Sequence, residues 1–333
     1  MALHQRVESR VSDLHVELGP PPWRSARLVE VGWTPSQIRR AVESGALTRL
    51  TRGVLSPAAA ASQLEVVRAL LEPLASHAAC SHETAADLNE QWFPRRRDEL
   101  IHVTVSGRPE RTDGRLRVHG SRLSDAFVVE MDGVRVTTVA RTAMDLGRGR
   151  SFPDALVALD GAARRIVTGG DPDVERSLRL RLLPAEVIGA AIAELEAAYT
   201  EVWSWPGTRV LRQALDKVDP RSESPFESWS RGCLLDSGAP PFEINAPVRG
   251  ASGRLYFGDF VWRRERLIGE ADGMSKYGVT AGQQRRALQD QRAREDDLIA
   301  VGWRFVRWVT GEPARTLTSR VAVAVHRDPR VTA

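Results

Sequence analysis

The stretch from Arg254 to Gly273, RLYFGDFVWRRERLIGEADG, decides the fold of the C-terminal part of the chain. Two apolar runs, YFGDFVW and LIGEAD, flank the charged turn RRER, and this pattern predicts two consecutive β-strands. The first run carries Asp259, and the second carries Glu270 and Asp272. Because charged residues are depleted in central strands, these three carboxylates need an explanation.

The segments around the two strands predict an α/β domain. The expected order of elements is α-β-β-β-α-β-α, which implies a meander followed by a right-handed crossover that returns the last strand parallel to the third. Around strands at Arg254–Val261 and Leu267–Asp272, the sequence predicts helices at Ser224–Asp236, Ala281–Val301 and Ala314–Val325, and strands at Phe242–Val248 and Trp303–Val309.

The three carboxylates predict a metal site. Glu270 and Asp272 share one face of their strand because side chains alternate with period two. If Asp259 lies opposite Glu270, the carboxylates converge and repel one another unless a cation lies among them. Hard oxygen ligands suit Mg²⁺ or Mn²⁺, and such an ion activates water against a phosphodiester. The structural alternative is that Asp259 begins a turn and that Glu270 pairs with an arginine from residues 263–266.

The same segment resembles the very-short-patch-repair-like members of the PD-(D/E)XK nuclease superfamily. The resemblance implies that Asp259 and Glu270 bind the metal together with the carbonyl oxygen of Ala271, while Glu227 assists from the first helix. The matching pieces are Glu227, Asp259, EADG at 270–273, RED at 294–296 and GWRFVR at 302–307.

Two features of this segment leave alternatives open. Glu227 is also the last residue of the capping box Ser224-Pro225-Phe226-Glu227, where a glutamate needs no catalytic role, and both explanations stand equally. The family usually has a lysine two residues after the second carboxylate, where this chain has Asp272. Lys276 is the predicted catalytic substitute for that lysine. Arg292 and Arg294 of the long helix are predicted to bind DNA, because arginine orients phosphate but is a poor base.

Residues 20–57 predict a winged helix-turn-helix. Thr34-Pro35-Ser36-Gln37 is a capping box with proline at the first helical position, and Gly45 fits the end of this helix. Such a helix would enter the major groove of DNA, and the wing would contact phosphates. An ordinary solvated helix face is the alternative. The predicted DNA-binding residues are Gln37, Arg39 and Arg40 in the helix and Arg49 and Arg52 in the wing.

The remaining segments complete an α/β (α+β multi-domain) organisation. Residues 62–170 predict a mixed α/β middle domain, residues 171–219 a helical connector, and residues 220–328 the nuclease-like domain with its α-β-β-β-α-β core. Leu28–Leu55 together with SHETAADL at 81–88 and VTTVARTAMDLGR at 136–148 resembles AbiEi-type antitoxins. The resemblance implies a winged helix joined to a mixed α/β domain.

Composition narrows the classes of protein. The 333 residues are 42% hydrophobic and 27% charged, which is globular composition, and no apolar run approaches the ~18 residues of a membrane span. The net charge of +4 mildly favours a nucleic-acid partner. The two cysteines, Cys80 and Cys233, lie far apart among apolar residues, which favours buried thiols and a cytoplasmic protein without a membrane partner.

These observations predict a DNA-binding, Mg²⁺- or Mn²⁺-dependent endonuclease-like protein that acts on double-stranded DNA in defence or repair. A partner toxin or defence protein is the other partner considered. The alternative is a non-catalytic, DNA-binding transcriptional regulator or antitoxin of the AbiEi type, which the missing lysine favours. A protein-interaction scaffold is a third hypothesis, and the basic helix argues against it.

Overall fold

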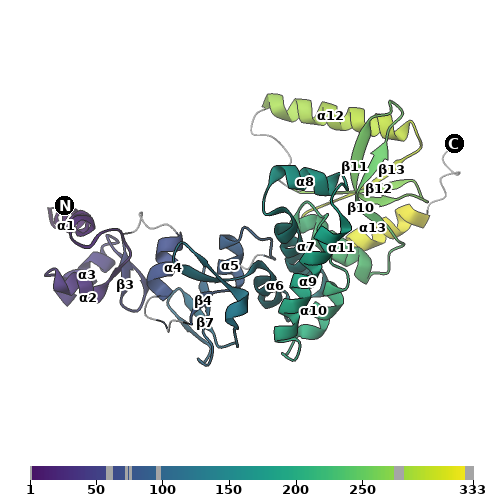
Figure 1. Cartoon of the computed structure of the whole chain (residues 1–333). Coiled ribbons are helices and arrows are strands. Elements are labelled where there is room, and N and C mark those ends of the chain that lie inside the picture. The colour runs from purple at the N-terminus through teal and green to yellow at the C-terminus, as the bar shows by residue number, and fades with distance from the viewer. Residues whose placement is uncertain are drawn as a thin grey trace. The chain divides into compact units, whose positions relative to one another are not determined.

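A computed structural model of the chain describes residues 2–57, 63–71, 74, 77–94, 99–273 and 281–326. Within these residues the protein is a multi-domain α/β protein with three β-sheets, as the sequence predicted (Figure 1). The chain divides into two compact units, Met1–Asn89 with Arg95–Thr142, and Glu90–Pro94 with Ala143–Ala333. The four finer segments predicted from the sequence stay a prediction. No helix in the described part of the chain is both long and apolar enough to span a membrane.

The N-terminal part of the first unit contains the predicted helix and wing, preceded by helix α1. The capping box of Thr34 and Gln37 is present, and Ile38 and Ala41 are buried beside Leu28 and Trp33. The strands form an antiparallel sheet in the order β1-β3-β2. The elements are α1 (Ala2–Leu18), β1 (Trp23–Arg24), α2 (Ser25–Glu30), α3 (Pro35–Glu43), β2 (Thr48–Thr51) and β3 (Val54–Ser56).

The rest of the first unit is a six-stranded sheet in the order β6-β7-β5-β4-β9-β8. Val103, Val118 and Val136 are buried in its core. The strands are β4 (Ala79–Cys80), β5 (Ile101–Thr104), β6 (Arg111–Asp113), β7 (Leu116–His119), β8 (Val128–Met131) and β9 (Val134–Thr137). The helices are α4 (Gln63–Leu71), α5 (His82–Leu88) and α6 (Val139–Gly147), the last of which leads into the second unit.

The second unit is built around α7 (Phe152–Thr168), a helix that the sequence analysis did not predict. Ser151 caps its start by accepting a hydrogen bond from the Asp154 amide, and Gly169 ends it in the left-handed conformation. Most of its residues are buried, so it lacks the one-sided apolar stripe that reveals a surface helix. Around it lie α8 (Pro172–Arg179), α9 (Ala185–Val202), α10 (Thr208–Leu215) and α11 (Pro225–Asp236).

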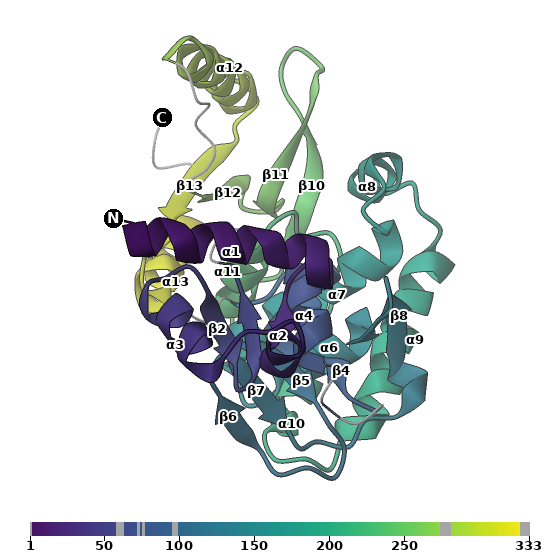
Figure 2. The same cartoon turned by 90° about the vertical axis from the view of Figure 1, so that its left-hand side faces the viewer.

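The C-terminal sheet has the predicted order and directions. Its strands run β10-β11-β12-β13, the first three antiparallel and the last parallel to β12. Strands β10 and β11 extend together as a long hairpin (Figure 2). The elements are β10 (Glu243–Arg249), β11 (Leu255–Trp262), β12 (Leu267–Asp272), α12 (Ala281–Ile299), β13 (Arg304–Val309) and α13 (Ala314–His326).

Helices cover both faces of this sheet. Leu234 of α11 and Leu317 of α13 pack with Phe260 and Leu267 on one face. Leu298 of α12 packs with Val261 and Ile268 on the other. Figure 1 shows α12 on one side of the strands and α11 and α13 on the other. Because side chains alternate along a strand, the face with Val261 and Ile268 also carries the odd residues of β11 and the even residues of β12.

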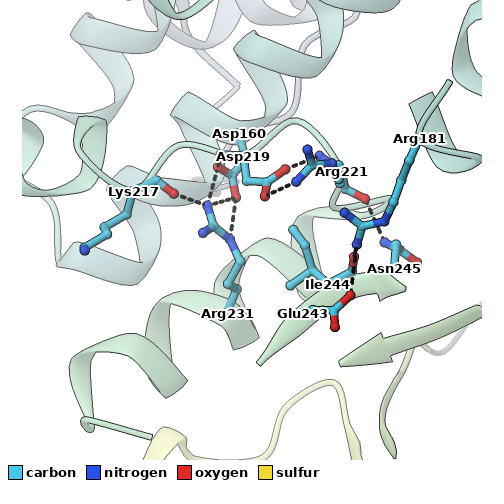
Figure 3. A network of polar contacts seen from close by, with 9 residues as sticks. All are labelled: Asp160, Arg181, Lys217, Asp219, Arg221, Arg231, Glu243, Ile244 and Asn245. Atoms are coloured by element: carbon cyan, nitrogen blue, oxygen red, sulfur yellow. Dashed lines mark hydrogen bonds and ion pairs between the residues drawn. The ribbon is translucent and has the colours of Figure 1, made fainter. Parts of the chain in front are cut away.

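A buried ion pair joins α7 to α11, one of the helices that cover the C-terminal sheet (Figure 3). The Arg231 Nη2 atom of α11 lies 2.7 Å from Oδ1 of Asp160 of α7, and their side chains are 8% and 0% exposed. Asp160 also accepts hydrogen bonds from the Asp219 amide at 2.9 Å and the Ser228 hydroxyl at 2.6 Å. Arg231 donates to the Lys217 carbonyl. The pair therefore fixes both the start of α11 and the segment before it.

Candidate active site

Asp259 and Glu270 lie on the adjacent antiparallel strands β11 and β12. The last paired residues at this end of the two strands are Phe260 and Gly269, and Asp259 and Glu270 are the next residue on each strand. Both carboxylates line one pocket of about 400 Å³. The structure thus brings together the two residues on which the metal prediction chiefly depends. The proposed turn at Asp259 is wrong, because this residue lies inside β11.

Each of these carboxylates is oriented by a specific donor. The Oδ2 atom of Asp259 accepts the Ala271 amide at 2.8 Å. Both oxygens of Glu270 accept from the Arg294 guanidinium, at 2.8 and 3.3 Å, and Arg294 also donates to the Phe257 carbonyl at 2.5 Å. This two-pronged pairing is the strong geometry for a guanidinium and a carboxylate. An arginine does pair with Glu270, as the structural alternative supposed, but it comes from α12 and not from residues 263–266.

Helix α12 places Arg294 there through its packing. Leu298, one helical turn later, is buried against Val261 and Ile268 on the face that carries Asp259 and Glu270. Residues four apart lie on the same side of a helix, so Arg294 turns toward the carboxylates. Arg292 is exposed. Two arginines of this helix are predicted to bind DNA. The side chain of Arg294 contacts Glu270 in the pocket, whereas that of Arg292 is exposed on the protein surface.

Asp272 has different surroundings from the other two carboxylates. Its Oδ2 atom lies 3.8 Å from Nε of Arg307, which also pairs with Glu295 at 2.5 Å, and Asp272 is not among the residues lining the pocket. Within the described residues, no group of three or more His, Cys, Asp or Glu side chains is arranged to hold a metal ion. Of the three carboxylates predicted to bind the metal, Asp259 and Glu270 line the pocket, and the carbonyl oxygen of Ala271 is the third predicted ligand.

These donors fit a hard divalent ion. A carboxylate has about four lone-pair positions on its two oxygens, so Glu270 can accept from Arg294 and still coordinate a cation. Carboxylates with a main-chain carbonyl, completed by water, form an oxygen donor set typical of Mg²⁺. Lys276, the predicted catalytic lysine, lies outside the described residues.

Glu227 supports the wall of the pocket. It lines the pocket and is 7% exposed. Its carboxylate accepts from the Ser224 hydroxyl at 2.9 Å, the Glu223 amide at 2.8 Å and Nδ2 of Asn245 at 3.0 Å. Ser224 in turn accepts from the Glu227 amide at 3.1 Å. Ser224 therefore caps α11 as the sequence predicted, the Glu227 carboxylate is held by the Glu223 amide and the Ser224 hydroxyl beside this cap, and Glu227 also lines the candidate active site.

Arg179 and Glu223 also line the pocket, and neither residue belongs to a motif in the sequence. The Nε atom of Arg179 at the end of α8 lies 3.2 Å from Oε1 of Glu223, and its guanidinium lies 4.9 Å from the ring centroid of Phe257. Burial raises the pKa of Glu223 above its ordinary value. Since these contacts depend on how α8 packs, no local sequence pattern could have revealed them.

The predicted DNA-binding residues of the first unit are largely exposed. Arg39 and Arg40 project from α3, while Arg49 and Arg52 lie at the wing, and all four are exposed. Gln37 differs, because its Oε1 atom accepts the Thr34 amide at 2.8 Å and the Thr34 hydroxyl at 3.1 Å. Its side-chain oxygen therefore closes the capping box, and the four arginines are better placed to contact phosphates.

The proteins that this chain resembles in sequence or structure carry no named activity. No protein-family model matches the sequence. The chain is 29% identical over 296 residues to two proteins of Mycobacterium tuberculosis, and the match spans 87% of this chain and 96% of each relative. They are named Uncharacterized protein MT2308 (strain CDC 1551 / Oshkosh) and Uncharacterized protein Rv2248 (strain ATCC 25618 / H37Rv). The crystal structure of the RV2827C protein from the same species aligns with a TM-score of 0.37 and 17% identity, covering 64% of this chain and 82% of that one.

Proposed function

We propose that the protein is a Mg²⁺- or Mn²⁺-dependent endonuclease that binds double-stranded DNA and acts in the cytoplasm in defence or repair. The observation that carries this proposal is that Asp259 and Glu270, on adjacent antiparallel strands, line one pocket that also contains arginines. A bound divalent ion would lower the pKa of the attacking water and offset charge on the scissile phosphate.

The surrounding residues have separate roles in this proposal. Asp259, Glu270 and the Ala271 carbonyl hold the ion, and the Ala271 amide fixes the orientation of Asp259. Arg294 holds Glu270 in place through its two-pronged contact. Glu227 and Asn245 keep the start of α11 against β10, which stabilises the adjoining wall. An active site needs such a supporting layer, because small misplacements of the reacting groups cost much of the rate.

The winged helix supplies DNA binding in this proposal. A helix of this kind fits the wide major groove of B-form DNA better than the narrow major groove of RNA, so double-stranded DNA is the favoured substrate. The four exposed arginines on α3 and the wing support it by their charge and exposure. A toxin or another defence protein as a partner remains part of the proposal through the resemblance to AbiEi-type antitoxins.

Two observations favour a second function, a non-catalytic DNA-binding regulator or antitoxin. The guanidinium of Arg294 already neutralises Glu270, and Asp272 stands where the related nucleases usually have a lysine. Because Arg294 balances the negative charge of Glu270, the pocket is stable without a metal ion. In this case DNA binding would persist without cleavage.

Metal binding is expected to stabilise the folded protein. An ion that binds only the folded state adds about 2.7 kcal/mol at a hundredfold excess over its dissociation constant. Asp259→Asn should remove this gain, whereas Asp290→Asn, at an exposed position of α12 outside the pocket, should keep it. Thermal unfolding with and without Mg²⁺ or Mn²⁺ measures the effect. A melting temperature that millimolar metal leaves unchanged in the wild type would argue for a purely structural cluster.

DNA binding is expected to depend on salt through the arginines of α3. Each lost phosphate contact should flatten the slope of log affinity against log salt by about 0.9, because fewer counterions are released on binding. The double variant Arg39→Ala/Arg40→Ala should therefore bind more weakly and with a flatter slope. Arg111→Ala/Arg115→Ala, at exposed positions outside the winged helix, is the matched control. Equal slopes for the two double variants would remove α3 from the DNA interface.

A further inference from the structure

The candidate active site needs a positively charged side chain that can bind the phosphate of an anionic substrate. Among the described residues that line the pocket, Glu223, Glu227, Asp259 and Glu270 are carboxylates, and Arg179 and Arg294 are cationic. Without compensation, the excess negative charge would repel a phosphodiester. Arg294 donates to both oxygens of Glu270 and to the Phe257 carbonyl, so it is held by three contacts.

Arg179 is held much less firmly than Arg294. Its side chain is 47% exposed, and Nε makes an ion pair of 3.2 Å with Glu223, whose side chain is 29% exposed. An ion pair with one exposed partner is weak, since water solvates the guanidinium of Arg179 and competes with Glu223 for it. The ring of Phe257 supports the guanidinium at 4.9 Å without using its hydrogen-bond donors. Arg179 can therefore exchange its partner at small cost while keeping its position.

We propose that Arg179 binds a phosphate of the DNA strand in this pocket, and that Glu223 holds the guanidinium there when DNA is absent. This inference rests on the proposed function, because it assumes that the pocket receives DNA. The planar guanidinium matches the two non-bridging oxygens of a phosphodiester. On binding, Arg179 would exchange the Glu223 carboxylate for the phosphate, so α8 would contribute a substrate-positioning residue to a site otherwise built by the sheet, α11 and α12.

The proposal predicts opposite effects for the two partners of the ion pair. Arg179→Ala removes a phosphate contact, so DNA affinity should fall. Glu223→Gln removes a negative charge and releases Arg179, so DNA affinity should rise. If the pair served only to hold α8 against α11, both substitutions would act in the same direction, through a lower melting temperature.

The experiment measures binding of a short DNA duplex to the full chain in the Glu270→Gln background, which avoids cleavage. Arg179→Ala should flatten the log-log salt slope by about 0.9, Arg179→Lys should restore the slope, and Glu223→Gln should tighten binding. The matched control is Arg176→Ala, an exposed arginine one turn earlier on α8 that does not line the pocket. Equal slopes for Arg179→Ala and Arg176→Ala would overturn the inference.

A cleavage assay on the chain without Glu270→Gln separates this inference from the proposed function. If the protein does not cut DNA but Arg179→Ala still flattens the slope, the phosphate contact stands and the nuclease proposal falls. If the protein cuts DNA in a metal-dependent way and Arg179→Ala binds with an unchanged slope, the nuclease proposal stands and Arg179 is not a phosphate ligand.

Discussion

Glu270→Gln is expected to lower the rate of DNA cleavage by several orders of magnitude while DNA binding by the winged helix persists. Glutamine keeps the shape of the side chain and can still accept a hydrogen bond from Arg294. It loses the negative charge that a divalent ion requires from its ligand, so the ion would no longer be held beside the scissile phosphate. The loss should therefore appear in the chemical step and not in affinity for DNA.

The matched control for this substitution is Glu265→Gln, in the turn between the same two strands and outside the pocket. It should cut DNA at the wild-type rate. Lys276→Ala, tested in parallel, should cost less than Glu270→Gln if the lysine only positions phosphate, and a comparable amount if it relays a proton. If Glu270→Gln and Glu265→Gln cut DNA equally fast, Glu270 is not a metal ligand for catalysis.

Asp160→Ala is expected to destabilise the second unit by about 3–5 kcal/mol, because removal of one partner leaves a buried charge uncompensated. Arg231 would keep its contact with the Lys217 carbonyl but lose all of its contacts with the carboxylate (Figure 3). The Asp219 amide and the Ser228 hydroxyl would also lose their acceptor. Urea unfolding of the full chain, followed by tryptophan fluorescence, measures the change.

Two further variants separate the buried charge from the loss of packing. Glu196→Gln removes one partner of the half-exposed pair with Arg212 and should cost about 0–1 kcal/mol. The double variant Asp160→Leu/Arg231→Met replaces both charges by apolar side chains and should recover the part of the loss that comes from the uncompensated charge of Arg231, while the Asp219 amide and the Ser228 hydroxyl still lack their acceptor. A loss for Asp160→Ala no larger than for Glu196→Gln would show that the buried pair contributes little.

The Asp160 network also connects stability to the candidate active site. Asp160 fixes the Asp219 amide, and two residues later the Arg221 carbonyl accepts from Nδ2 of Asn245 at 2.7 Å. The same Nδ2 atom donates to Glu227 in the pocket wall. Asn245 lies on β10 beside Ile244, whose carbonyl accepts from Arg181 at 3.0 Å (Figure 3). A substitution at Asp160 is therefore expected to disturb the pocket as well as the core.

The sequence predicted the C-terminal sheet well because its strands are short apolar runs separated by clear turn signals. The hairpin of β11 and β12, the parallel return of β13 and the meeting of Asp259 with Glu270 all follow from strand periodicity and chain order. Helix α7 was missed for the opposite reason. Its apolar residues surround the helix because it is buried on most sides, so no stripe was visible in the sequence.

Side-chain partners were less predictable than the backbone, because they depend on contacts between distant elements. The pairing of Glu270 with Arg294 requires α12 to pack on the sheet through Leu298, 28 positions after Glu270. Arg179 reaches the pocket from a segment that appeared to be only a helical connector. Capping residues show the reverse case, since local spacing predicted the contacts of Thr34 with Gln37 and of Ser224 with Glu227.

The most direct test of the central claim is nicking of supercoiled plasmid DNA by the purified full chain, with Mg²⁺ or with a chelator. The account predicts that wild-type protein converts the plasmid to open-circular and linear forms only with the metal. Asp259→Asn, prepared by the same steps, should leave the plasmid supercoiled while it still binds DNA. Metal-dependent nicking of equal rate in both preparations, or its absence from wild-type protein that binds the plasmid, would contradict the claim that this pocket cleaves DNA.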